Sequence, residues 1–173
     1  MSTTWPPPIR LAEIGRGAKT FELEADADTR AKIASRLGLK SLPSFTARLV
    51  IGPWLDGAEI HGRFDAVVEQ VCGISLDPFE QNLGGQVDVR VVPAGSPNAP
   101  QESLGEVVLE ADLPDPPDVL EGDSIDLAEY LVEHLALEID PFPRKPDAVF
   151  DYVPDSKEES PFAVLKALKA NDD

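Results

Sequence analysis

The sequence predicts an α+β fold: an antiparallel β-sheet or partial barrel with two or three packed helices and a C-terminal helix. Residues 45–51 and 60–69 alternate between apolar and polar side chains, which is typical of half-buried strands. The Asp56-Gly57 pair between them is the usual signal of a hairpin turn. Further along, leucines at a spacing of four (Leu127, Leu131 and Leu135) are typical of one apolar face of a helix.

Three elements are expected before the first long strand. Residues 9–14 form a short apolar segment, either a strand or a single turn. Residues 19–25 alternate as a strand, with Phe21 and Leu23 on one face. A helix is predicted over 27–37, because Asp26 or Asp28 can cap its start and Gly38 can end it.

The second half continues the sheet and then adds helices. A third strand is predicted over 79–92, with a bulge or bend at Gly84-Gly85, so that the three long strands form an antiparallel meander. Asp126 and Glu129 have the spacing of a capping box at the start of the leucine helix. Ser160 followed by Pro161 predicts the start of a short C-terminal helix.

The chain is expected to be a single domain, 1–173, because its length suits one ordinary core. Residues 1–93 form a mainly β body and 94–123 an acidic, loop-rich connection. Residues 124–140 carry the helix, and 141–173 form an extended tail with the short C-terminal helix.

The net charge of -17 is unevenly distributed. In residues 1–71, nine Lys and Arg balance nine Asp and Glu, whereas residues 72–173 hold six against twenty-three. Thirteen carboxylates lie between Glu102 and Asp140 with no basic residue among them. Such a field repels nucleic acid and attracts basic partners, so a positively charged protein is the expected partner, although simple solubility would also account for the charge.

Several kinds of chemistry lack the residues they need. Cys72 is the single cysteine, so no disulfide or structural zinc site is expected, and a small buried residue is the preferred interpretation. The N-terminus has no signal-peptide pattern and no run is long enough to cross a membrane, which favours a cytoplasmic protein. No phosphate-binding motif is present, and no cofactor is predicted.

Two alternatives remain open at the level of residues. The acidic stretch could hold a hard cation, but it lacks an ordered ligand motif and a solvated acidic loop is preferred. Direct RNA contact would rest on the basic residues of the first half, without the aromatic platforms of RNA-binding modules, so that contact is expected to be weak. Those basic residues are Arg10, Arg16, Lys19, Arg30, Lys32, Arg36, Lys40, Arg48 and Arg63.

An ordered set of motifs resembles the YceD family, the large ribosomal RNA subunit accumulation proteins. The motifs span residues 76–79, 122–129, 135–143 and 160–168, and the resemblance covers roughly 9–169. It implies support of large-subunit ribosomal RNA processing or accumulation, and the family brings no catalytic residues to carry over. Some members carry further cysteines near Cys72, which would permit a metal site. This chain has Gly73, Ile74 and Ser75 there, so no metal is expected.

The predicted function is a non-enzymatic factor in assembly of the large ribosomal subunit. It would bind a basic ribosomal protein or a large-subunit precursor particle through its acidic half, with neither a membrane nor DNA as a partner. The alternatives are a metal-dependent RNA-processing enzyme and an acidic nucleic-acid mimic that inhibits a basic protein. The predicted partner contacts are Asp123, Asp126, Glu129, Glu133, Phe162, Leu165 and Lys166.

Overall fold

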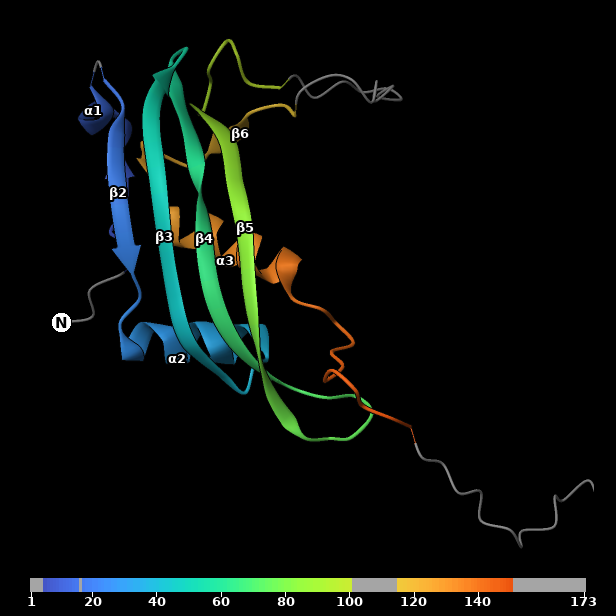
Figure 1. Cartoon of the computed structure of the whole chain (residues 1–173). Helices are drawn as coiled ribbons and strands as arrows, with labels where there is room; N and C mark the ends of the chain where they lie inside the picture. The colour runs from blue at the N-terminus through green and yellow to red at the C-terminus, as the bar shows by residue number, and fades with distance from the viewer. Residues whose placement is uncertain (1–4, 16, 101–114, 151–173) are drawn as a thin grey trace, which may run out of the picture.

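The computed structural model describes residues 5–15, 17–100 and 115–150 and is an α+β fold (Figure 1). The strands are β1 (Ile9–Arg10), β2 (Lys19–Glu24), β3 (Ser41–Trp54), β4 (Gly57–Val71), β5 (Pro78–Pro93), β6 (Asp118–Leu120) and β7 (Ser124–Ile125). The helices are α1 (Leu11–Ile14), α2 (Ala27–Leu37) and α3 (Leu127–Glu138). The helix predicted from Ser160 lies outside the described residues.

Five strands form one open sheet in the order β2-β3-β4-β5-β6, so the partial barrel considered as an alternative is not formed. The predicted antiparallel meander is confirmed, because β3 pairs with β4 and β4 with β5 in antiparallel register. β6 was not predicted. It pairs in parallel with only the last three residues of β5, Val91 to Pro93. Strands β1 and β7 form a separate two-stranded pair.

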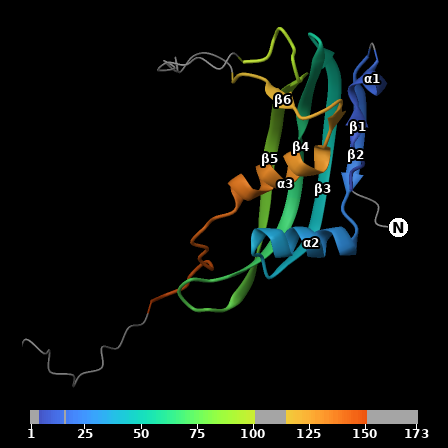
Figure 2. The same ribbon diagram turned by 180° about the vertical axis from the view of Figure 1, so that it is seen from behind.

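Both long helices cover the same face of this sheet (Figure 2). The core lies between them and the apolar side of the strands, where Phe45, Leu49 and Phe64 meet Leu131 and Leu135 of α3. These five residues are at most 1% exposed. The leucine stripe therefore does what its spacing predicts, and the opposite face of the sheet is left without a covering helix (Figure 1).

The glycine pair in β5 has a different role from the predicted bulge. The register runs unbroken through Asp65 opposite Gly84 and Phe64 opposite Gly85, so of the predicted bulge or bend the bulge does not form. A Cβ at Gly85 would lie 2.7 Å from the Phe64 ring. Glycine is required here because the buried ring occupies the space of a side chain on the neighbouring strand.

The start of the chain shows why residues 9–14 were ambiguous. Ile9 and Arg10 pair with β7, and the chain then turns directly into α1, so this segment is a short strand followed by a single helical turn.

The 27–37 helix is confirmed with both its ends. Asp26 accepts a hydrogen bond from the Thr29 N–H at 2.7 Å, and Gly38 adopts the left-handed conformation with φ of 67°. That conformation is strained for residues with a side chain, which explains the glycine.

Candidate functional site

Asp126, one of the predicted partner contacts, caps α3. Its carboxylate accepts hydrogen bonds from the backbone N–H groups of Ala128 at 3.0 Å and Glu129 at 3.2 Å. The predicted capping box is only half formed, because the Glu129 side chain does not return to Asp126. A long-range ion pair takes the Glu129 carboxylate instead.

Glu129 is joined to Arg36 of α2 by two hydrogen bonds between the guanidinium and the carboxylate. These bonds hold the pKa of Glu129 below its usual range and raise that of Arg36. Residue 36 belongs to the charge-balanced half of the sequence and residue 129 to the acidic half. The charge asymmetry along the chain is therefore partly cancelled in space.

Two of the four predicted carboxylates remain exposed and, among the described residues, unpaired by a basic residue. Asp123 and Glu133 neither cap α3, as Asp126 does, nor bind Arg36, as Glu129 does. Phe162, Leu165 and Lys166 lie outside the described residues. The structure therefore brings the four carboxylates near one helix but leaves only two of them available to a partner.

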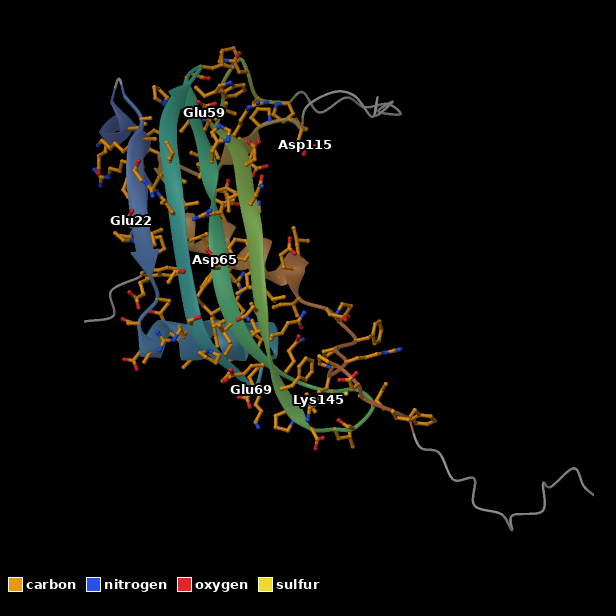
Figure 3. The ribbon with its side chains drawn as sticks, in the orientation of Figure 1. Glu22, Glu59, Asp65, Glu69, Asp115 and Lys145 are labelled. Atoms are coloured by element: carbon orange, nitrogen blue, oxygen red, sulfur yellow. The ribbon has the colours of Figure 1, made fainter. Side chains whose placement is uncertain are left out.

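A stronger concentration of acidic groups lies at the edge of the sheet, where β5, β6 and α3 meet. A depression of about 460 Å³ is lined there by Asp88, Val89, Arg90, Asp115, Pro116, Asp118 and His134. We call it the acidic depression. Asp115 marks its position beside the upper end of β5 (Figure 3). Its three carboxylates against one guanidinium give it a net charge of -2 with His134 neutral.

The partners of these carboxylates differ. Asp118 hydrogen-bonds the Tyr130 hydroxyl, and burial together with this negative neighbour raises the Tyr130 pKa, so the phenol keeps its proton. Asp88 lies 3.0 Å from Nδ1 of His61. Among the described residues, Asp115 makes no ion pair. The depression thus presents unneutralised negative charge to solvent.

Only part of this site can be recognised from the sequence. Asp115 and Asp118 belong to the acidic stretch, but Asp88, Arg90 and His134 come from other elements. Arg90 is positioned by stacking over the Trp54 ring, 5.4 Å from its centroid. No spacing in the sequence predicts that convergence, because the parallel pairing of β6 with β5 creates it.

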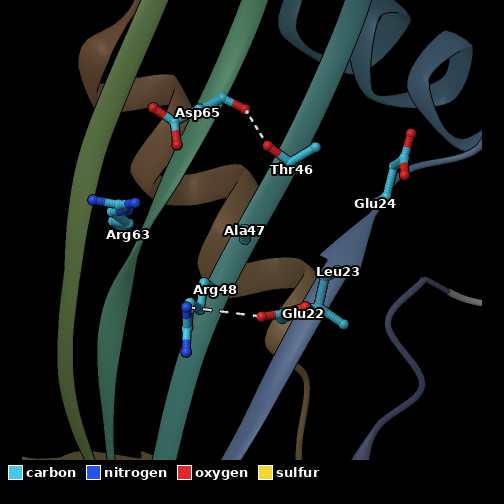
Figure 4. A pocket seen from close by; sticks show the side chains of 8 residues that line it. All are labelled: Glu22, Leu23, Glu24, Thr46, Ala47, Arg48, Arg63 and Asp65. Atoms are coloured by element: carbon cyan, nitrogen blue, oxygen red, sulfur yellow. Dashed lines mark hydrogen bonds and ion pairs between the residues drawn. The ribbon is translucent and has the colours of Figure 1, made fainter.

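The uncovered face of the sheet offers a contrasting depression of about 340 Å³ (Figure 4). Glu22, Glu24, Arg48, Arg63 and Asp65 line it, and Arg48 lies 3.8 Å from Glu22. Alternating signs on neighbouring strands leave little net field. This face is therefore a weaker candidate for binding a strongly charged partner.

Most basic side chains proposed for RNA contact already have acceptors within the protein. Arg36 binds Glu129, Lys40 lies 3.2 Å from Glu69, and Arg30 donates to the Ala25 carbonyl at 2.6 Å. Affinity for a phosphate backbone comes from lysine and arginine that can neutralise it. These contacts reduce the positive charge available to RNA.

Cys72 lies in the turn between β4 and β5 and is fully buried. Its sulfur accepts hydrogen bonds from the backbone N–H groups of Ile74, Ser75 and Lys145, at 3.3–3.4 Å. Within the described residues, no three His, Cys, Asp or Glu side chains gather as a ligand set.

The same three donors predict a titration. With the Ser75 side chain they lower the Cys72 pKa to about 6, the Ser75 N–H being the largest contribution, and outweigh the burial that would raise it. Thiolate absorbance of the native protein should therefore rise with a midpoint near pH 6, and Cys72→Ser should lack this transition. Because the folded pKa lies below the unfolded one, stabilisation by the thiolate is complete at high pH and is lost as the pH falls toward 6. A native midpoint near 8.5 would contradict the hydrogen-bonding account.

Comparisons with known proteins give one match. A family model described as "Large ribosomal RNA subunit accumulation protein YceD" matches residues 60–169, which include most of β4, all of β5 and α3, and the acidic stretch. No curated protein and no solved structure matches. Within the described residues, no helix is long and apolar enough to cross a membrane.

Proposed function

This chain belongs to the YceD family, and from that premise we propose that it supports accumulation of the large ribosomal RNA by binding a basic partner, without catalysis. The partner is a basic ribosomal protein or a large-subunit precursor particle that carries one. The acidic depression is the contact surface, together with Asp123 and Glu133 nearby on the chain.

The observation that carries this proposal is the contrast between acidic and basic groups. Carboxylates from β5 and from the segment before β6 converge on one depression, and Asp115 has no neutralising partner among the described residues. The basic residues of α2 are meanwhile engaged within the protein. A surface with this balance attracts lysine and arginine side chains and repels phosphates.

Charge complementarity also suggests a mechanism. A basic ribosomal protein binds RNA non-specifically through its phosphates before it reaches its own site. A carboxylate-lined surface that binds the same lysine and arginine side chains would prevent this non-specific RNA binding. The basic protein would then be released to RNA at its correct site. Only binding and release are required, with no bond made or broken.

Affinity purification of the full chain from its own cells tests this function. The purification is done at low salt and at about 0.5 M salt, where screening shortens the range of charge interactions to a few ångströms. We expect large-subunit proteins to be recovered at low salt, to persist after RNase treatment and to be lost at high salt.

The other outcomes point to other functions. Recovery that disappears with RNase would mean that RNA forms the contact. A basic protein unrelated to ribosomes would favour the acidic-mimic alternative, and metal-dependent cleavage of precursor RNA by the pure chain would favour the enzyme. Each of these results would overturn the proposal.

A further inference from the structure

We propose that a groove of mixed polar and apolar lining, at the end of the sheet opposite β6, binds this chain's own C-terminal segment, residues 160–169, with Phe162 inserted. The groove has a volume of about 290 Å³ and lies where the end of β4 meets α2 and the segment that follows α3. Its apolar lining residues are Leu37, Val71, Ile139, Pro141 and Pro143, and its polar ones are Lys40, Gln70 and Asp140. The Lys40 ammonium lies 3.2 Å from Glu69, so Asp140 is the charge of the groove that has no ion pair among the described residues.

Gln70 gives the groove an unsatisfied acceptor. The side chain is 7% exposed, and its Nε2 donates to the Asp140 carbonyl at 3.2 Å. Its Oε1 is buried and has no hydrogen-bond partner among the described residues. A buried acceptor without a partner is costly, and an occupant that brought an N–H group would relieve that cost.

Segments next to the groove in the chain expose large apolar side chains. Phe142, between the lining residues Pro141 and Pro143, is 77% exposed, and Leu76, in the turn after β4, is 75% exposed. The backbone that carries them is fixed, because the Gly73 N–H donates to the Pro143 carbonyl at 2.9 Å and the Lys145 N–H donates to the Cys72 sulfur. An apolar surface on a fixed backbone is suited to receiving another apolar segment.

The position of the chain identifies the occupant. The last described residue, Phe150, is seven residues beyond Pro143, which lines the groove. The orange-to-red segment that follows α3 runs toward this same lower end of the sheet (Figure 1). Eleven residues separate Phe150 from Phe162, a tether of up to about 36 Å when extended. Such a tether holds the segment at an effective concentration in the millimolar range, so weak contacts suffice.

The chemistry of the segment is complementary to the groove. Phe162, Leu165 and Leu168 recur at a spacing of three, which places them along one side of a helix. Lys166 and Lys169 are adjacent to that side and can approach Asp140, which is exposed at the groove. The apolar contacts and the opposite charges therefore favour the same orientation of the segment, with Phe162, Leu165 and Leu168 facing the groove. Phe162 and Leu165 then make contacts within the chain, a role independent of the proposed function.

Backbone and side-chain amide NMR of the full chain tests this inference with two variants. Phe162→Ala removes the inserted ring, and Ala167→Gln is the control because it changes a side chain on the opposite side of the expected helix without breaking it. We expect Phe162→Ala to shift the Gln70 side-chain amide and the Val71 and Ile139 backbone amides, and Ala167→Gln to leave them in place.

Two results would overturn the inference. Unchanged groove resonances in Phe162→Ala would mean that the segment does not bind there. Shifts that depend on protein concentration, with a dimer in sedimentation equilibrium that Phe162→Ala dissolves, would assign the groove to a second copy of the chain.

Discussion

Replacing Phe64 by alanine is expected to destabilise the protein by about 3–5 kcal/mol, the range typical of a fully buried phenylalanine. Phe64 is 1% exposed and packs edge-on against Phe45, with ring centroids 5.9 Å apart. On its other side the ring covers Gly85, which has no side chain to fill the cavity that alanine would leave. A loss of this size is a large part of the stability of an ordinary domain.

Urea unfolding followed by circular dichroism measures this effect. The midpoint should fall sharply in Phe64→Ala with little change in slope, because the surface exposed on unfolding is similar. Val149→Ala is a suitable control, since Val149 is 81% exposed and its truncation should change stability by less than about 0.5 kcal/mol. A loss below about 1 kcal/mol for Phe64→Ala would contradict the packing of β4 on β5.

The second large effect is expected at Leu131 of α3. This side chain is fully buried between the helix and the sheet, so Leu131→Ala should cost about 2–5 kcal/mol. The matched control is Leu137→Ala on the same helix, because Leu137 is 82% exposed and the same atoms are removed. Equal losses for the two variants would mean that α3 does not pack as described. Urea unfolding of both variants, followed by circular dichroism, measures the two losses.

Much of this fold was predictable from local patterns. The hairpin between β3 and β4, the three-stranded meander, the helix over 27–37 and the leucine stripe of α3 all arise from spacings within a few residues. The hairpin turns at Leu55-Asp56, one residue before the Asp56-Gly57 signal, because Gly57 already pairs with Trp54. Each of these features depends on side chains that recur on one face, and that recurrence can be read from the sequence.

The parts that sequence reasoning missed depend on contacts between distant residues. The parallel pairing of β6 with β5 joins residues 27 positions apart, Val91 with Asp118, and only three pairs are involved. The Gly84-Gly85 pair looked like a bulge because the partner that requires it, Phe64, is on another strand. Glu129 fitted a capping box, but Arg36, 93 residues away, takes its carboxylate.

The candidate site also has one part that local sequence predicts and one part that depends on contacts between distant residues. Charge counts along the chain correctly indicate where carboxylates are abundant, and Asp115 and Asp118 come from that stretch. They cannot indicate which carboxylates are neutralised, because Arg36 reaches across from the charge-balanced half to Glu129. The contribution of Asp88 from β5 likewise requires the sheet to be formed.

The most direct test of the central claim compares two triple variants with the same change in net charge. One carries Asp88→Asn, Asp115→Asn and Asp118→Asn in the acidic depression. The other carries Glu22→Gln, Glu24→Gln and Asp65→Asn on the uncovered face of the sheet. Binding of each to the large-subunit protein recovered with the natural chain is measured by titration calorimetry at physiological salt. The account predicts at least tenfold weaker binding for the first variant, about 1.4 kcal/mol, and little change for the second. Equal weakening by both would mean that only net charge matters, and unchanged binding by the first would contradict the acidic depression as the contact surface.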